Sequence, residues 1–251
     1  MTNSLNEYSV LTFDCYGTLI DWESGIWDAL QPLLMKINPD DSASFTRDRV
    51  LGTFAKHEST LQNDQPKMPY PDLLANVHQL LADEFQIQTT EDMNQIFGHS
   101  VPHWPAFPDT ADSLRELSKH YKLVILSNID NRGFAASNRK LGVTFDAIYT
   151  AEMIGSYKPD DRNFRFMLEK LREDFGFERR HILHTAQSLH HDHVPARKHN
   201  LANAWIDRQN LVEKSSWGAT SAVEERPKYD YLFPTLQAMA NALQAELDRE
   251  G

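Results

Sequence analysis

The stretch from Val10 to Ile20 constrains the fold of this chain more than any other part of the sequence. It reads Val-Leu-Thr-Phe-Asp-Cys-Tyr-Gly-Thr-Leu-Ile, so an apolar run ends abruptly in a carboxylate, Asp14, which a turn glycine and a threonine soon follow. Such a run predicts a buried strand that delivers Asp14 to its carboxyl end. In open parallel α/β sheets, ligands bind outside these strand ends, and Gly17 lets the backbone turn tightly there. We therefore expect Asp14 to take part in chemistry; the alternative is an ordinary aspartate that caps a turn.

Further along the chain, short apolar runs alternate with segments of helical spacing. The runs that we expect to form strands are residues 122–128, 145–149, 181–186 and 202–206. Apolar residues at helical spacing predict helices between these strands and a last helix over residues 233–247. Residues 213–226, which contain Ser-Ser-Trp-Gly, predict a surface loop. Strands that alternate with helices favour an α/β fold with a Rossmann-like parallel sheet.

Four helical patterns in succession, with no strand between them, separate the first predicted strand from the second. They lie near residues 22–34, 45–61, 73–85 and 90–97. This succession does not fit the alternation of a parallel sheet. We therefore predict a helical cap domain over residues 21–100, inserted into a core formed by residues 1–20 and 101–251. The alternative is that these helices pack on the faces of the sheet.

Composition excludes several kinds of partner and site. The chain has 251 residues, and its formal net charge of -11 disfavours nucleic acid and anionic membrane surfaces as partners. Cys15 is the only cysteine, so neither an intrachain disulfide nor a thiolate-rich zinc site can form. The polar start of the chain does not resemble a signal peptide, and no apolar run approaches the roughly 20 residues of a membrane span. These features predict a cytoplasmic protein with no nucleic-acid or membrane partner.

Reactive side chains follow the predicted strands in an order that is informative as a set. They are Asp14, then Ser127 with Asn128, then Lys158 before Pro159, and finally Asp192. In this order they resemble the four motifs of the haloacid dehalogenase superfamily. Asp14-Cys15-Tyr16-Gly17-Thr18 is similar, more narrowly, to the Asp-x-Tyr-Gly-Thr form of the 2-haloacid dehalogenases, because the phosphatases of the superfamily usually carry a second Asp where Tyr16 stands. The resemblance covers nearly the whole chain, including the helical cap.

The resemblance implies a role for each of these residues. Asp14 would be the nucleophile, Lys158 its partner and Asp192 the acid of the fourth motif. The hydroxyl of Ser127 would bind the substrate anion, and the amide of Asn128 would help to hold the departing halide. The remaining residues that we assign to substrate binding are Tyr16, Thr18, Gln187 and Ser188.

Acid–base chemistry supports the same roles independently of the resemblance to the superfamily. A carboxylate at a strand end is a competent nucleophile while it is ionised, and a neighbouring ammonium such as Lys158 lowers its pKa. Attack by Asp14 would give an aspartyl ester, which water hydrolyses with the help of a base. Asp192 is the candidate base. Asp192 is also a candidate helix N-cap, because the segment from Val194 resembles a first helical turn, and the two roles are compatible.

The leaving group separates the two activities of the superfamily. An alkoxide that leaves from a phosphate ester usually needs a proton, whereas a halide does not. Tyr16, with an ordinary pKa near 10, is a poor proton donor at neutral pH. We therefore predict hydrolytic dehalogenation of a small 2-halo carboxylate, without a metal or other cofactor. The alternatives are a magnesium-dependent phosphatase with an atypical first motif, and a binding protein that keeps the fold but catalyses nothing.

Three features depart from the dehalogenase pattern. Dehalogenases place a cap arginine beside the halide, yet no arginine occurs between Arg49 and Arg115. Leu189 stands where they carry an asparagine. The run His190-His191-Asp192-His193 has the composition of a metal site, but consecutive residues of one turn cannot all converge on one ion. The expected partner is a small anionic substrate, and the cap and the acidic surface permit a homodimer.

Overall fold

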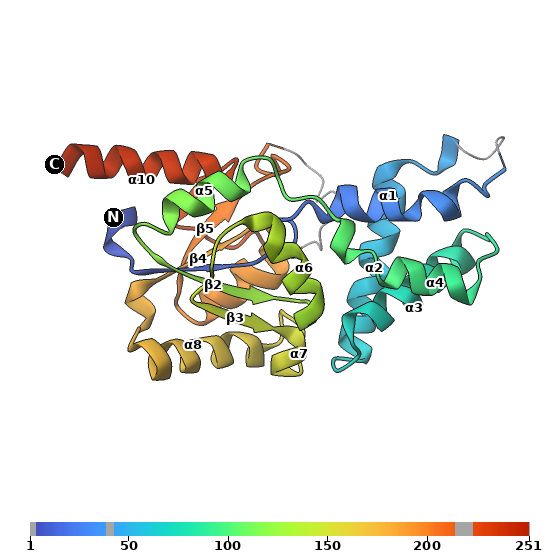
Figure 1. Ribbon diagram of the computed structural model, residues 1–251, viewed down its shortest axis with the longest axis horizontal. Helices are drawn as coiled ribbons and strands as arrows, with labels where there is room; N and C mark the ends of the chain where they lie inside the picture. Colours follow the sequence, from blue (N-terminus) through green and yellow to red (C-terminus); the bar gives the residue numbers. More distant parts are fainter. Residues whose placement is uncertain (1–3, 39–42, 214–222, 251) are drawn as a thin grey trace.

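A six-stranded parallel sheet forms the centre of the computed structural model, which describes residues 4–38, 43–213 and 223–250 (Figure 1). The strand order is β3-β2-β1-β4-β5-β6. The strands are β1 (Val10–Phe13), β2 (Lys122–Ser127), β3 (Ala147–Thr150), β4 (Ile182–Ala186), β5 (Ala202–Ile206) and β6 (Tyr231–Phe233). Because β1 lies between β2 and β4, the residue that follows it, Asp14, is flanked by the carboxyl ends of both neighbours. The α/β class predicted from the sequence is confirmed.

Alternate residues of the strands face two separate layers of helices. Leu11 and Phe13 belong to the larger core cluster, together with apolar side chains of α5 (Thr110–Leu117), α6 (Asn131–Leu141) and α10 (Leu236–Glu250). Val10 belongs to a second cluster on the other face, with side chains of α8 (Asp161–Phe175) and α9 (Val194–Lys198). The short α7 (Ala151–Ile154) follows β3 directly. Both faces are thus covered, as buried parallel strands require.

The four helices predicted between the first two strands are all present. They are α1 (Trp22–Leu34), α2 (Arg47–Asp64), α3 (Tyr70–Glu84) and α4 (Glu91–Gly98), and Figure 1 shows them as a group apart from the sheet. Side chains at three of their N-caps accept backbone hydrogen bonds: Asp21 from Ser24, Thr46 from Arg49 and Thr90 from Met93. These helices contact one another in succession, α1 with α2, α2 with α3 and α3 with α4, rather than covering the faces of the sheet. The domain boundaries at residues 20 and 100 stay predictions.

The chain leaves the sheet and returns to it through two segments that lie side by side. The N–H of Asp21 donates to the carbonyl of Pro105 (2.8 Å), and the N–H of Phe107 donates to that of Leu19 (3.1 Å). Next to this junction, Gly25 of α1 packs on Trp104, where an added Cβ would come within 2.3 Å of the indole. A glycine is required at this position because the helix and the ring approach so closely.

The C-terminal segment differs from the prediction. Residues 233–247 were expected to form one helix, but Tyr231–Phe233 forms the edge strand β6 and the helix begins at Leu236. The reason is Pro234, since a residue that precedes proline is pushed towards extended backbone. The third strand also begins two residues later than predicted, at Ala147. Of the loop predicted over residues 213–226, residues 214–222 lie outside the described part of the chain.

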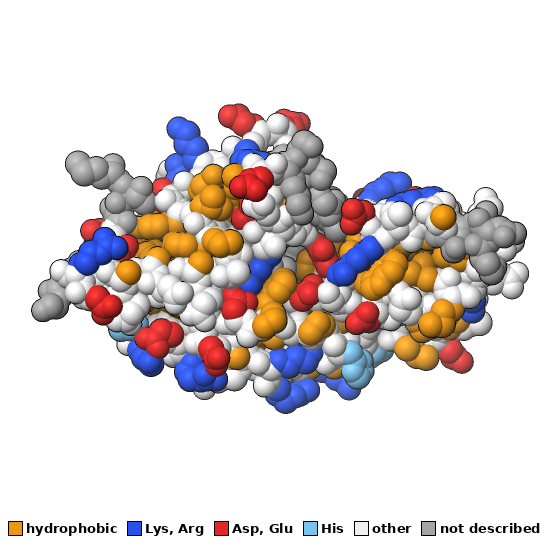
Figure 2. Space-filling model, turned by 90° about the horizontal axis from the view of Figure 1, so that it is seen from above, with side chains coloured by type: hydrophobic (Ala, Val, Ile, Leu, Met, Phe, Trp, Pro, Cys, Tyr) orange, Lys and Arg blue, Asp and Glu red, His pale blue; other side chains and the backbone are white. Residues whose placement is uncertain are grey.

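The surface carries charges of both signs. On the face drawn in Figure 2, acidic and basic side chains are interspersed. Within the described residues, no helix combines the length and the apolar character that crossing a membrane demands.

Candidate active site

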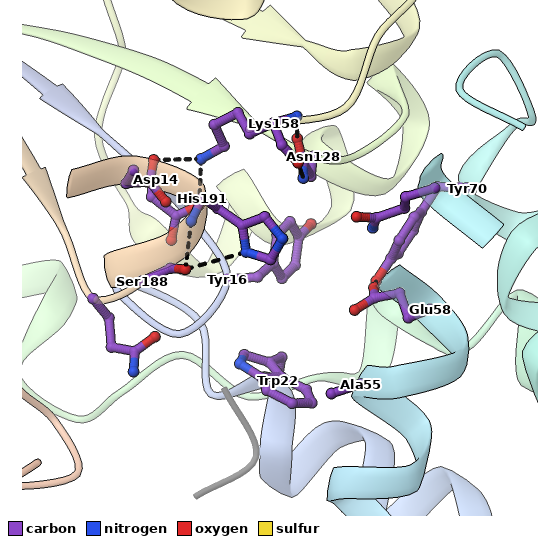
Figure 3. A pocket seen from close by; sticks show the side chains of 13 residues that line it. Asp14, Tyr16, Trp22, Ala55, Glu58, Tyr70, Asn128, Lys158, Ser188 and His191 are labelled. Carbon is purple, nitrogen blue, oxygen red and sulfur yellow. Dashed lines mark hydrogen bonds and ion pairs between the residues drawn. The ribbon is translucent and has the colours of Figure 1, made fainter. Parts of the chain in front are cut away.

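A small cavity of about 80 Å³ lies between the carboxyl ends of the strands and the inserted helices (Figure 3). Residues of both parts line it. From the core come Asp14, Tyr16, Asn128, Lys158, Gln187, Ser188, His191 and Asp192; from the inserted helices come Trp22, Ala55, Glu58, Gln62 and Tyr70. The fold thus brings together side chains that lie as far apart in the sequence as Asp14 and Asp192.

The ammonium of Lys158 occupies the centre of the core side. Its Nζ lies 2.9 Å from Oδ1 of Asp14 and 2.7 Å from Oδ1 of Asp192, and it also donates to the carbonyl of Leu126 (2.9 Å). Lys158 is 2% exposed and Asp192 is fully buried. A buried ammonium with three acceptors is fully hydrogen-bonded, which offsets part of the cost of removing it from water. The structure therefore places the three predicted catalytic residues in one ion-pair cluster.

Burial and pairing shift the pKa values of the three groups in different directions. Burial raises the pKa of Asp14, and Lys158 offsets only part of this rise, so the expected net lowering of this pKa by the lysine is not found. Burial alone would also raise the pKa of Asp192, but Lys158 and His184 hold it well below its usual range. Burial lowers the pKa of Lys158, yet the two carboxylates outweigh this and raise it. Lys158 therefore keeps its proton, and Asp14 is the more basic of the two carboxylates.

Thr18 fixes the second oxygen of Asp14. Its hydroxyl donates to Oδ2 of Asp14 (2.8 Å) and accepts from the N–H of Gln187 (2.9 Å). Thr18 is fully buried and does not line the cavity, so this hydroxyl orients Asp14 instead of facing a ligand. Gln187 does line the cavity, and its Nε2 is buried without a hydrogen-bond partner in the described part of the chain. Buried donors are normally paired, so this amide is available to a bound molecule.

Ser127 and Asn128 lie at the end of β2, as expected, but in different surroundings. The side chain of Asn128 clamps the backbone of Lys158: it donates to the carbonyl (3.0 Å) and accepts from the N–H (2.6 Å). Asn128 still lines the cavity. Ser127 is not among the lining residues, and its Oγ is buried with no partner within the described residues. The substrate-binding roles of both residues stay predictions.

Tyr16 lines the cavity with its ring held from two sides. Its hydroxyl is hydrogen-bonded to Oγ of Ser137 (2.9 Å), and its ring packs edge-on against Trp104 at 5.5 Å between centroids. Burial raises the pKa of Tyr16 well above its ordinary value. The phenol therefore retains its proton at neutral pH more firmly than an exposed tyrosine would.

Asp192 lies in a π-helical turn, Leu189–His193, that precedes α9. Asp192 does not occupy an N-cap position, because His193 directly precedes α9 and Ser188 caps the π-helical turn. The Oγ of Ser188 accepts from the N–H of His191 (3.1 Å). Asp192 instead points into the core, and its Oδ2 is buried without a partner among the described residues. Oδ2 is therefore free to accept a hydrogen bond from water.

Two histidines around Asp192 support the structure, and neither can join a metal centre. His184 of β4, which the sequence analysis did not single out, lies with Nε2 3.0 Å from Oδ1 of Asp192 and Nδ1 2.8 Å from Oγ1 of Thr12. His193 is bonded to Asn203 and to the carbonyl of Ala186. The available signal for His184 was an imidazole that directly follows the apolar pair Ile182-Leu183 within a predicted buried strand.

The residues contributed by the inserted helices were missed. Glu58 and Gln62 follow Phe54 at intervals of four residues on α2, so they continue its buried stripe with polar side chains. Polar residues on such a stripe were the available signal. The two arginines of α2 lie elsewhere: Arg47 donates to Ser24, and Arg49 donates to the carbonyl of Ser44. No arginine is found among the described residues that line the cavity.

Magnesium, which the phosphatase alternative requires, does not suit the residues present. Hard cations prefer several oxygen ligands, above all carboxylates. In residues 4–38, 43–213 and 223–250, no group of three or more His, Cys, Asp or Glu side chains is arranged to hold an ion. Asp14 and Asp192 are both bonded to the ammonium of Lys158, and the residues next to Asp192 are histidines rather than a further acid.

Comparisons with known proteins agree with this geometry. Residues 8–184 match the family described as haloacid dehalogenase-like hydrolase. The L-2-haloacid dehalogenase PA0810 is similar in structure, with a TM-score of 0.71 and 22% identity, over 94% of this chain and 99% of that one. The L-2-haloacid dehalogenase from Xanthobacter autotrophicus with chloropropionic acid covalently bound has a TM-score of 0.72 and 15% identity, over 94% and 98%.

A magnesium-bound protein shares the fold as well. YfnB from Bacillus subtilis bound to magnesium has a TM-score of 0.72 and 17% identity, over 95% of this chain and 99% of that one. A comparison with curated protein sequences finds no match. At these identities the similarity to solved structures establishes the fold alone.

Proposed function

Because the chain belongs to the haloacid dehalogenase-like hydrolases, we propose that it hydrolyses a small 2-halo carboxylate through an ester formed on Asp14. An oxygen of Asp14 attacks the carbon that bears the halogen, and the carbon–halogen bond breaks as the carbon–oxygen bond forms. The halide leaves with the bonding electrons, and attack from the opposite side inverts the carbon. Water then attacks the ester carbonyl, which releases the 2-hydroxy acid and regenerates Asp14, while the proton passes to solvent.

The surroundings of Asp14 support both halves of this reaction. Lys158 and Thr18 each hold one carboxylate oxygen, so the nucleophile is fixed before the substrate binds. The raised pKa of Asp14 reflects a more basic, and hence more nucleophilic, carboxylate. Asp192 has a low pKa and is a weak base, so its unpartnered Oδ2 would orient the hydrolytic water and take up its proton only transiently.

The choice of a halide as the leaving group rests on the state of Tyr16. Its hydroxyl is hydrogen-bonded to Ser137, and its pKa lies well above the ordinary value. A phenol in this state does not readily protonate a leaving alkoxide, whereas a halide departs without a proton. The covalent chloropropionic acid in the similar enzyme from Xanthobacter autotrophicus supports the same ester chemistry.

Release of halide in the absence of magnesium is the first expected result. The purified protein should release chloride or bromide from short 2-halo acids, and a chelator should leave the rate unchanged, because no step of the proposed reaction uses a metal ion. Phosphate esters should be poor substrates. Ion chromatography of halide and a colorimetric phosphate assay, each with added magnesium and with chelator, measure both reactions.

Tyr16→Asp provides the matching test of the phosphatase alternative. If Tyr16 merely replaces the phosphatase acid, this substitution should raise magnesium-dependent phosphate release by about 10²- to 10⁴-fold, the usual contribution of a general acid. We expect no such gain. Magnesium-dependent phosphate release by the unmodified protein would contradict the proposed leaving group.

A further inference from the structure

The charges around the cavity are poorly matched to a simple 2-halo carboxylate. Three acids line it, Asp14, Asp192 and Glu58, whereas Lys158 supplies the one ammonium or guanidinium among the described lining residues. The ammonium of Lys158 is already bonded to both aspartates. His191 adds no charge, because burial lowers its pKa to about 3. A purely anionic substrate would therefore meet an additional carboxyl group on the cap side without a cation to offset it.

Glu58 is held in place on the wall of the cavity that the inserted helices form. The hydroxyl of Tyr70 donates to its Oε1 at 2.6 Å, and Figure 3 shows the pair opposite Asp14, Lys158 and His191 across the cavity. Gln62, one helical turn further along α2, is buried and lines the same wall. Burial raises the pKa of Glu58 to about 7, and the hydrogen bond from Tyr70 opposes this rise only in part. Glu58 is half-buried, and a carboxylate that is partly removed from water without a cation is unfavourable, so a cationic ligand group at this position would be stabilised.

We propose that Glu58 determines the specificity of this site by binding an ammonium group that the substrate carries on the side nearest the cap. This inference rests on the proposed function, in which Asp14 attacks the halogen-bearing carbon. It defines the class of substrate more narrowly. The substrate is a 2-halo carboxylate with a protonated amine on the next carbon, and the product is a 3-amino-2-hydroxy acid. The ammonium pairs with Glu58, while the halogen-bearing carbon faces Asp14.

Three product-like ligands isolate the contribution of the ammonium. Lactate, glycerate and isoserine share the 2-hydroxy carboxylate and differ only at the third carbon, which carries a hydrogen, a hydroxyl or an ammonium. The protein should bind isoserine about 10- to 100-fold more tightly than lactate by isothermal titration calorimetry, the range expected for a hydrogen bond to a charged group. Glu58→Gln should reduce this preference to about threefold or less, because the amide keeps the shape of the side chain but not its charge.

Two further variants separate a binding role from a structural one. Glu84→Gln changes an exposed carboxylate on α3 that pairs with His57, and should keep the full preference for isoserine. Tyr70→Phe removes the hydroxyl that holds Glu58, and should weaken the preference less than Glu58→Gln does. If Glu58 had only a structural role in holding Tyr70, Glu58→Gln would lower the melting temperature. The ratio of the affinities for isoserine and lactate would then stay unchanged.

The pH dependence of binding gives an independent readout. An ammonium ligand favours ionised Glu58, so the affinity for isoserine should rise as the pH increases through about 7, whereas the affinity for lactate should fall. Among the neighbouring groups, burial keeps the pKa values of Tyr16, Tyr70 and Tyr157 above 10, His191 is neutral, the pKa of Lys158 is raised, and that of Asp192 is low. The pKa of Asp14 is also raised, but Asp14 is present in both proteins, so the comparison with Glu58→Gln isolates the contribution of Glu58. In the Glu58→Gln variant, the affinities for isoserine and lactate should no longer change in opposite directions as the pH rises.

The outcomes separate this inference from the proposed function. Equal affinities for lactate and isoserine, a preference that survives Glu58→Gln, or no isoserine binding at millimolar concentration would overturn the role of Glu58, even if halide is released. A Glu58-dependent preference for isoserine in a protein that releases no halide from 2-chloropropionate or 3-amino-2-chloropropionate would support the role of Glu58 and overturn the proposed reaction.

Discussion

Asp14→Asn is expected to abolish turnover while the fold stays intact. The amide is a far weaker nucleophile than the carboxylate, and loss of a nucleophile typically lowers kcat on the order of 10⁴-fold or more. The amide oxygen can still accept from Lys158 or Thr18, so the packing around the cluster should be kept. Initial rates of halide release, together with circular dichroism and thermal unfolding, measure the two effects separately.

A matched substitution controls for the change from carboxylate to amide. Asp248→Asn removes an exposed charge on α10, where Asp248 accepts a hydrogen bond from Gln244, and should leave both rate and stability unchanged. Substantial activity in a folded Asp14→Asn protein would mean that no covalent bond to this residue is needed. Asp14 would then be a binding residue, and water would attack the substrate directly.

Lys158→Met is expected to impair both activity and folding. Methionine retains much of the volume of lysine, but it leaves Asp14 and Asp192 buried without their shared cation. Breaking a buried ion pair in this way typically costs about 3–5 kcal/mol of stability. Activity should fall about 10²-fold or more, since the ammonium positions the nucleophile without being consumed. Urea unfolding and halide-release assays measure the two losses.

The stability lost in Lys158→Met should depend on pH. Without the ammonium, burial raises the pKa values of Asp14 and Asp192 in the folded protein above those in the unfolded chain. The folded state then binds more protons, so its stability falls as the pH rises, and the deficit should be smaller at about pH 5 than at about pH 8. Lys119→Met removes an exposed salt bridge to Glu116 and should leave the stability nearly unchanged at either pH. A Lys158→Met protein as stable and active as the unmodified one would contradict the role of this cluster.

The sequence was sufficient to predict the elements that bury the most apolar surface. The run Val10–Phe13 and the strands at residues 122–127, 182–186 and 202–206 read as short apolar segments because both faces of a parallel sheet are covered. Their carboxyl ends placed Asp14 near Lys158 and Asp192, since parallel strands end at the same edge. Four uninterrupted helical patterns likewise predicted the insertion before β2.

The parts that were not predicted depend on contacts between distant segments. β6 is short, with no fully buried residue, so its hydrophobic signal is weak and the following helix dominated the pattern. The position of Asp192 in a π-helical turn depends on Ser188 as a cap, a choice that the spacing of apolar residues does not reveal. The apolar stripe of α2 marks the face that carries Glu58, but the sequence does not specify which of the inserted helices lies opposite the carboxyl ends of the strands. The net pKa shift of Asp14 depends on the depth of burial, which is a property of the folded chain.

A single turnover in ¹⁸O-labelled water tests the central claim most directly. With the protein in excess over a 2-halo acid substrate, water that hydrolyses an ester on Asp14 attacks the carbonyl carbon of the side chain. The label should therefore appear in the carboxylate of Asp14, in the peptide that contains it, while the 2-hydroxy acid formed in the first turnover stays unlabelled. Mass spectrometry of that peptide and of the product distinguishes the two positions. Label in the product and none in Asp14 would mean that water displaces the halide directly, and would contradict the ester mechanism.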